Sequence, residues 1–172
     1  MIIRKNTYRE PINEASMLNA LNSTFYGGYK KFHNFFYSNH EADLFAVSEK
    51  MYATEVEVKC SLYDWQTDLR KSKHRNISPY IKYFYFAVPT SLINDQPEGF
   101  NEKYGLIEVY HEKDGVLWSR IIKPATILNN LKIPDELYQK ALVSTYHKYH
   151  QSRMMIRELK SRIEGMKNDN NI

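Results

Sequence analysis

One strictly alternating segment constrains the fold of this chain most. Residues 54–60 read Thr-Glu-Val-Glu-Val-Lys-Cys, so the two valines share one face and the charged side chains share the other. A period of two is typical of a β-strand with one buried face. A second strand is predicted over Ala42–Val47, and Ser48–Met51 is predicted to form the turn between them. We therefore expect a β-hairpin over residues 42–60.

Further elements follow from apolar spacing, turn residues and capping residues. Strands are predicted at 80–88, 104–110 and 116–122, the last two joined through Lys113-Asp114-Gly115, and helices at 11–21, 62–74 and 134–166. Ser61 is a plausible N-cap of the middle helix. The aromatic stretch 32–37 leaves helix and strand open.

Length and composition limit the class of protein. The chain has 172 residues, of which 42% are hydrophobic and 26% charged, so it can form one globular domain with an appendage. A single cysteine excludes a disulfide framework and a multi-cysteine zinc site. We find neither a signal peptide nor a transmembrane run, so a cytoplasmic location is the default expectation. The net charge of +4 permits an anionic partner without requiring one.

The predicted C-terminal helix carries a heptad seam. Steps of four and three separate its members, which are Tyr138, Leu142, Thr145, Tyr149, Ser152, Ile156, Leu159, Ile163 and Met166. At about 1.5 Å per residue this helix is about 45–50 Å long, longer than a domain of this size is wide. It therefore breaks, wraps the domain, or pairs with another chain. One expectation is a homodimer that forms through this helix. We expect residues 1–133 to form the domain and residues 134–172 to form a helical appendage.

Two carboxylates are expected to face each other in the hairpin. If the turn centres on Lys50, Asp43 lies opposite Glu57, and directly opposed side chains have Cβ atoms about 4.5–5.5 Å apart. Two like charges repel there unless a cation lies between them. Mg²⁺, or Mn²⁺ in its place, is a suitable ion, because Mg²⁺ binds through one or two carboxylates, water and phosphate. A register slip of one residue would send Asp43 to the other face.

Lys59 points to the same face as Glu57 and could offset charge that develops on a phosphate. Glu55 and Glu41 share this parity and are possible additional ligands. The competing interpretation is a solvated strand face on which Lys59 pairs with Glu55 or Glu57.

A family resemblance favours the first interpretation. Asp43 followed by Glu57-Val58-Lys59 on consecutive strands, and then a helix, resembles the PD-(D/E)XK nuclease superfamily. The similarity is greatest to MmcB-like bacterial DNA repair proteins and spans roughly residues 40–123. The further residues that carry it are Ala42, Leu44, Ser61, Asp64-Trp65, Asp68, Arg70-Lys71, His74, Tyr80, Tyr83–Pro89 and Gly105–Ile107.

The resemblance implies an α/β domain of the restriction-endonuclease type, with a central mixed sheet flanked by helices and here a long C-terminal helix. It implies that Asp43 and Glu57 bind metal, that the Val58 carbonyl is a possible further ligand, and that Lys59 is catalytic. Ala42 stands where the superfamily often has Pro. Relatives also place a glutamate of the first helix near the metal, and Glu14 either takes that role or is an exposed first-turn acid.

Residues beyond the hairpin suggest how the site is supported. Asp64 and Asp68, one helical turn apart, either orient Lys59 or Lys71, or form ordinary surface pairs. The densest basic run is a candidate for phosphate contacts, or alternatively a solvated helix end, and comprises Arg70, Lys71, Lys73, His74, Arg75 and Lys82.

The sequence thus predicts a Mg²⁺-dependent enzyme that hydrolyses phosphodiester bonds of single- or double-stranded DNA, with DNA repair as the setting. The alternative is a catalytically inactive nucleic-acid-binding or assembly protein that keeps the nuclease fold.

Overall fold

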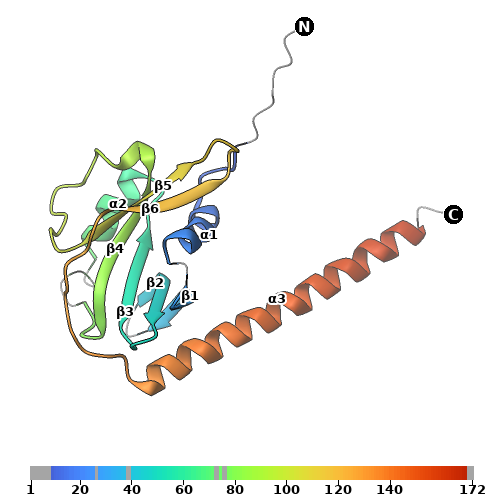
Figure 1. Ribbon diagram of the computed structural model, residues 1–172. Coiled ribbons are helices and arrows are strands. Elements are labelled where there is room, and N and C mark those ends of the chain that lie inside the picture. The colour runs from blue at the N-terminus through green and yellow to red at the C-terminus, as the bar shows by residue number, and fades with distance from the viewer. Residues whose placement is uncertain (1–8, 26, 38–39, 72–73, 75–76, 170–172) are drawn as a thin grey trace, which may run out of the picture. The chain divides into compact units, whose positions relative to one another are not determined.

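A computed structural model describes residues 9–25, 27–37, 40–71, 74 and 77–169 (Figure 1). One six-stranded sheet organises it, with strands in sequence order across the sheet. The strands are β1 (Tyr29–Tyr37), β2 (His40–Ser48), β3 (Ala53–Val58), β4 (Ile81–Pro89), β5 (Gly105–His111) and β6 (Leu117–Lys123). The helices are α1 (Glu14–Thr24), α2 (Leu62–Leu69), the short 3₁₀ helix η2 (Thr90–Leu92) and α3 (Asp135–Asp169).

The sheet is mixed. Strands β1, β2 and β3 form an antiparallel meander, β3–β4 and β4–β5 are parallel pairs, and β5–β6 is an antiparallel hairpin. Helix α2 makes the crossover between parallel strands β3 and β4, as parallel pairing requires a long connection. The predicted class, an α/β domain with a mixed sheet, flanking helices and a long C-terminal helix, is confirmed.

The predicted elements shift at their ends. The first helix begins at Glu14, because Asn13 caps it through a reciprocal bond with Ser16. The ambiguous stretch 32–37 belongs to strand β1. Helix α2 starts after the Ser61 cap as expected, but ends at Leu69, five residues before the predicted end at His74.

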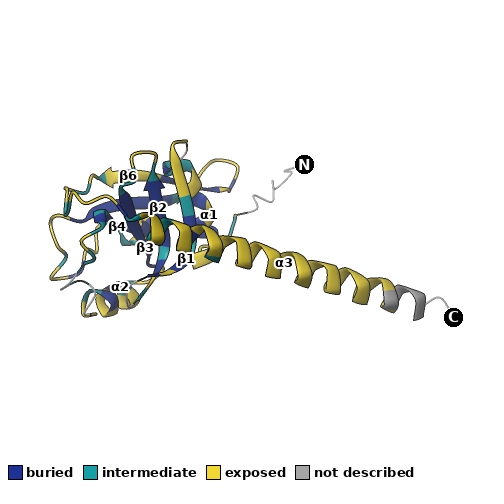
Figure 2. Ribbon diagram, turned by 90° about the horizontal axis from the view of Figure 1, so that it is seen from below, coloured by how far each residue is buried: buried dark blue, intermediate teal, exposed yellow. Residues whose placement is uncertain are grey.

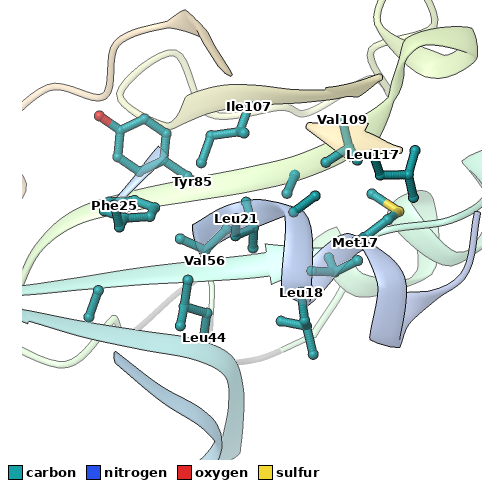
Figure 3. Close-up of a cluster of buried hydrophobic side chains, with 14 residues drawn as sticks. Met17, Leu18, Leu21, Phe25, Leu44, Val56, Tyr85, Ile107, Val109 and Leu117 are labelled. Carbon is teal, nitrogen blue, oxygen red and sulfur yellow. The ribbon is translucent and has the colours of Figure 1, made fainter. Parts of the chain in front are cut away.

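One face of the sheet packs against α1. Met17, Leu18 and Leu21 of α1 meet an apolar row that includes Val56 and Ile107, and the whole cluster is nearly inaccessible to solvent (Figure 3). Both valines of the alternating segment lie in this cluster, so the apolar face predicted for β3 is the core face.

The opposite face is aromatic and contains buried charge. Trp65 of α2 is fully buried, and its ring lies 5.7 Å from that of Phe86 on β4. Buried polar side chains of β3 and α2 lie on the same side of the sheet. Figure 2 colours much of the sheet as buried. Because an uncompensated buried charge is costly, these polar groups need partners, and they define the candidate site.

The chain divides into two compact units, with the division between Ile133 and Pro134. The second unit consists of α3, an unbroken helix of 35 residues. Within the described residues, no helix combines the length and apolar character that crossing a membrane requires.

Candidate active site

The β2–β3 hairpin has the predicted register. Leu44 pairs with Val56, and Phe45 pairs with Glu55, so paired residue numbers sum to 100. The same register places Asp43 beside Glu57 at the open end of the hairpin. The Asp43 carboxylate accepts a hydrogen bond of 2.7 Å from the backbone N–H of Val58. This bond fixes Asp43 against the end of β3.

Lys59 brings the two carboxylates into one cluster. Its Nζ lies 3.2 Å from Oε2 of Glu57 and 4.0 Å from Oδ2 of Asp43. Glu57 is 2% exposed and Lys59 5% exposed, whereas the Asp43 side chain is 22% exposed. The cluster therefore meets solvent mainly at Asp43.

Asp68 of α2 completes the cluster from above the sheet. It is fully buried, and its Oδ1 lies 3.6 Å from Lys59 Nζ and 2.6 Å from Lys71 Nζ. Of the two interpretations of Asp68, the structure supports the one in which it contacts Lys59. Asp64, one turn earlier, is exposed.

These carboxylates keep Lys59 charged. Burial by itself lowers the pKa of Lys59, but the charges of Glu57, Asp68 and Asp43 outweigh it and raise the pKa above its ordinary value. Lys59 is therefore an ammonium ion at neutral pH, and it acts in the cluster as a fixed positive charge.

His74 lies in this buried network rather than on a surface track for phosphates. Its side chain is 7% exposed, and Nε2 lies 2.9 Å from Oδ2 of Asp68. Its Nδ1 lies 3.4 Å from the hydroxyl of Tyr104, and its ring packs beside Phe84 and Phe86. A role of His74 in binding phosphate stays a prediction; the structure places its side chain inside the domain, in contact with Asp68.

Glu55 belongs to a neighbouring pair of contacts. It is 1% exposed, accepts a hydrogen bond from the Tyr37 hydroxyl, and lies 2.9 Å from Nε2 of His40. Burial, followed by the charge of Glu55, raises the pKa of Tyr37. Sequence patterns did not identify Tyr37 and His40 as partners of Glu55. Tyr37 ends the aromatic stretch and His40 begins β2, and no spacing rule links either position to a carboxylate.

Two other expected acids lie outside the cluster. Glu14 is an exposed residue in the first turn of α1, which is the alternative interpretation of that position. Glu41 is exposed as well, and its backbone pairs with Phe36 at the outer part of the sheet. The side chain of Val58 packs in the core under α1, so only its backbone faces the cluster.

The basic residues are spread out. Arg70 is exposed at the end of α2, and the side chain of Lys71 is 55% exposed while it contacts Asp68. Lys82 lies at the far end of the parallel pair, about 13 Å along β4 from the level of Glu57, with Nζ 3.8 Å from the ring centre of Tyr52. Lys73 and Arg75 lie outside the described residues. Among the described members of the basic run, Lys71 and His74 both contact Asp68 of the cluster.

The donors suit a hard divalent ion held by two carboxylates. Within the described ranges, no group of three or more His, Cys, Asp and Glu side chains is arranged to hold a metal ion. Asp43 and Glu57 supply the oxygen donors that Mg²⁺ prefers, and Mg²⁺ often takes only one or two carboxylates. The single ammonium of Lys59 contacts Glu57 and reaches the edge of Asp43, so one cation can interact with both.

Comparisons with known proteins bear on the fold alone. A solved protein of unknown function from Silicibacter pomeroyi superposes with a TM-score of 0.59 over 80% of this chain and 86% of its own, at 17% sequence identity. No family model matches the chain, and the search of curated proteins returned no match.

Proposed function

We propose that this protein is a Mg²⁺-dependent nuclease that hydrolyses phosphodiester bonds of DNA. The observation that carries the proposal is the convergence of Asp43, Glu57 and Lys59 at the open end of one hairpin. Two carboxylates and a buried ammonium ion, placed on adjacent strands, are the groups that this chemistry needs. The resemblance to MmcB-like proteins adds DNA repair as the proposed setting.

Each residue has a distinct role in this proposal. Asp43 and Glu57 would hold Mg²⁺, which when bound supplies Lewis-acid polarisation of a phosphate and a water of lowered pKa. Lys59 places a fixed positive charge where negative charge grows on the phosphate, and a buried charge of this kind acts more strongly than one in water. Asp68 holds the Lys59 ammonium in place, and the partly exposed Asp43 marks the side from which a substrate phosphate arrives.

The test compares variants in which one charged side chain is replaced by an uncharged one. Wild-type protein, Glu57→Gln and Lys59→Met are incubated with labelled single-stranded, duplex and forked DNA, and with RNA, in Mg²⁺ or Mn²⁺. We expect each variant to lose about 100-fold or more of the cleavage rate. Glu41→Gln is the matched control, because it removes one charge from an exposed position on β2 and should cleave at the wild-type rate.

Two results contradict the proposal. One is the absence of metal-dependent cleavage on every substrate by folded wild-type protein. The other is cleavage that Glu57→Gln and Glu41→Gln support equally, which would indicate a contaminating nuclease. Circular dichroism of each variant separates a lost site from a lost fold.

A second candidate function is nucleic-acid binding, or assembly, without chemistry. The observation that favours it is the ion-pair geometry, since Lys59 already lies within 4.0 Å of oxygens of Asp43, Glu57 and Asp68. An ammonium ion can balance the carboxylates without any metal. This candidate expects DNA binding that weakens with salt and is unchanged by a chelator, measured by fluorescence anisotropy.

A further inference from the structure

Helix α3 presents a long apolar seam to solvent. Its larger apolar members are 39–59% exposed, and they are Leu142, Tyr149, Ile156, Leu159, Ile163 and Met166. Figure 2 colours α3 as exposed along nearly all of its described length. In proteins, most of the stability of a helix comes from packing of its apolar face against a partner surface rather than from helix propensity. We therefore expect the apolar face of this helix to pack against a partner.

The heptad positions beside the seam carry positive charge. With Leu142, Tyr149, Ile156 and Ile163 at position a, the flanking e and g positions between residues 138 and 166 include four basic residues, and none of these positions is acidic. The four, called here the basic flanks, are Lys148, Arg153, Lys160 and Arg162. Flanking charges select the partner of a heptad helix, because they lie next to the partner's own flanks.

The acidic residues of this region lie away from the seam. Glu158 takes position c and Glu164 position b. Arg153, in contrast, leans along the seam, with its guanidinium 3.2 Å from the hydroxyl of Tyr149. Four of the six basic residues between 138 and 166 therefore lie at the seam edges, whereas both acidic residues lie at the back of the helix, where Lys140 and Arg157 also lie. Glu158 reaches one of the basic flanks from there, in an ion pair of 2.6 Å with Arg162.

This pattern opposes pairing of two copies of the chain. In a parallel pair, each g residue meets the e residue five positions later in the partner, so Lys148 would face Arg153. In an antiparallel pair, g faces g and e faces e, which again opposes basic residues. Thr145 and Ser152 at d positions weaken a symmetric seam further. Nucleic acid would match the basic flanks but would leave the apolar seam uncovered.

We propose that α3 docks an amphipathic α-helix of another protein, one with an apolar seam and acidic residues at its flanks. Burial of the two seams supplies affinity, and the opposite flanks fix partner choice and orientation. This interaction surface is separate from the buried charge cluster, so it holds whether or not the cluster is catalytic.

The experiment uses full-length protein and a designed probe helix. The probe has four heptads with Ile and Leu at a and d and Glu at e and g, and carries a fluorophore. We expect saturable one-to-one binding in an anisotropy titration. A second probe with Lys at e and g, and a third with Glu flanks but Ala at a and d, should bind at least tenfold more weakly.

Matched variants separate the seam edges from general charge. Arg153→Glu with Lys160→Glu should weaken binding of the acidic probe at least tenfold. The control, Lys140→Glu with Arg157→Glu, makes the same change in net charge at positions f and b, and should bind like wild type. Helical content by circular dichroism shows whether each variant keeps α3.

Several outcomes overturn the proposal. If both charge variants weaken binding of the acidic probe equally, the effect comes from net charge alone. If the probe with Ala at a and d binds as tightly as the probe with Ile and Leu, the apolar seam does not contribute to docking. Sedimentation equilibrium that shows a stable homodimer, lost on Ile156→Asp, would assign the seam to a second copy. Displacement of the probe by duplex DNA in the control variant as well as in wild type would assign the surface to nucleic acid.

Discussion

Asp68 joins three basic side chains of the buried charge network. It is fully buried and contacts Lys59, Lys71 and His74 at 3.6, 2.6 and 2.9 Å. If it is removed, the buried Lys59 loses a counter-charge and His74 loses its acceptor. Breaking a buried ion pair by removing one partner commonly costs about 3–5 kcal/mol.

We therefore expect Asp68→Ala to lower the free energy of unfolding by about 3–5 kcal/mol in urea denaturation. Asp64→Ala is the matched control, one turn away on the same helix and exposed, and should cost no more than about 1 kcal/mol. If the two variants lose equal stability, Asp68 does not hold the network together.

At the scale of single residues, the sequence predicts which face of a strand a side chain occupies better than it predicts which residues that side chain contacts. Period-two alternation is enough to put Glu57 and Lys59 on one face, and a symmetric turn is enough to place Asp43 beside them. The role of His74 could not be predicted in this way, because it follows from where the chain returns after α2. Its contacts with Asp68 and Tyr104 join residues 6 and 30 positions apart, and local patterns do not record such distances.

At the scale of elements, strand β1 contains an irregularity that sets the aromatic face. Asn34 has a φ of 49°, in the left-handed region, and Phe32 and Phe35 on either side of it both reach the ring of Phe45. A regular strand would send two residues three apart to opposite faces. The left-handed backbone conformation at Asn34 therefore directs both rings, and then Tyr37, toward the face that contains Glu55.

Substitutions at Asn34 should report this backbone strain. Asn34→Val should lower the free energy of unfolding by about 1–2 kcal/mol, because a β-branched residue tolerates the left-handed region poorly. Asn34→Gly should cost less than Asn34→Val, because Gly adopts a positive φ without steric cost. Lys30→Val, an exposed change on the same strand, is the control, and chemical denaturation measures all three. A Val variant as stable as the Gly variant would show that β1 is regular in solution.

At the scale of the whole molecule, features that depend on local periodicity could be predicted from the sequence, whereas features that depend on pairing between distant strands could not. The hairpin 42–60 and the long helix rest on local periodicity, and both are found. The position of Lys82 rests on the parallel pairing of β4 with β3, in which Thr54 lies beside Tyr83. That pairing is non-local, so the basic run is continuous in the sequence although Lys71 and Lys82 lie at different ends of the β3–β4 pair.

The two-unit division predicts how the chain responds to truncation. The apolar core under α1 uses residues between Met17 and Leu117, and the buried charge cluster also lies before the boundary. The last residue of the first unit is fastened by a hydrogen bond of 2.9 Å from Ile133 N–H to the carbonyl of Met51. A chain that ends at Ile133 should therefore unfold cooperatively with a midpoint within about 5 °C of the full chain, since 1 kcal/mol corresponds to about 4–8 °C for a domain of about 60–100 residues and about 2–4 °C for one of about 150–250 residues.

A shorter truncation provides the comparison. A chain that ends at Lys123 also loses the hydrogen bonds from Thr126 to Lys103 and from Leu128 to Lys82, 2.9 Å each, which tie segment 124–133 across the sheet. We expect it to melt clearly below the chain that ends at Ile133, in calorimetry at equal concentration. Aggregation or loss of the transition in both chains would mean that α3 contributes to the folded core. Loss of binding to the acidic probe helix, with the transition retained, would place stability in the first unit and partner binding in α3.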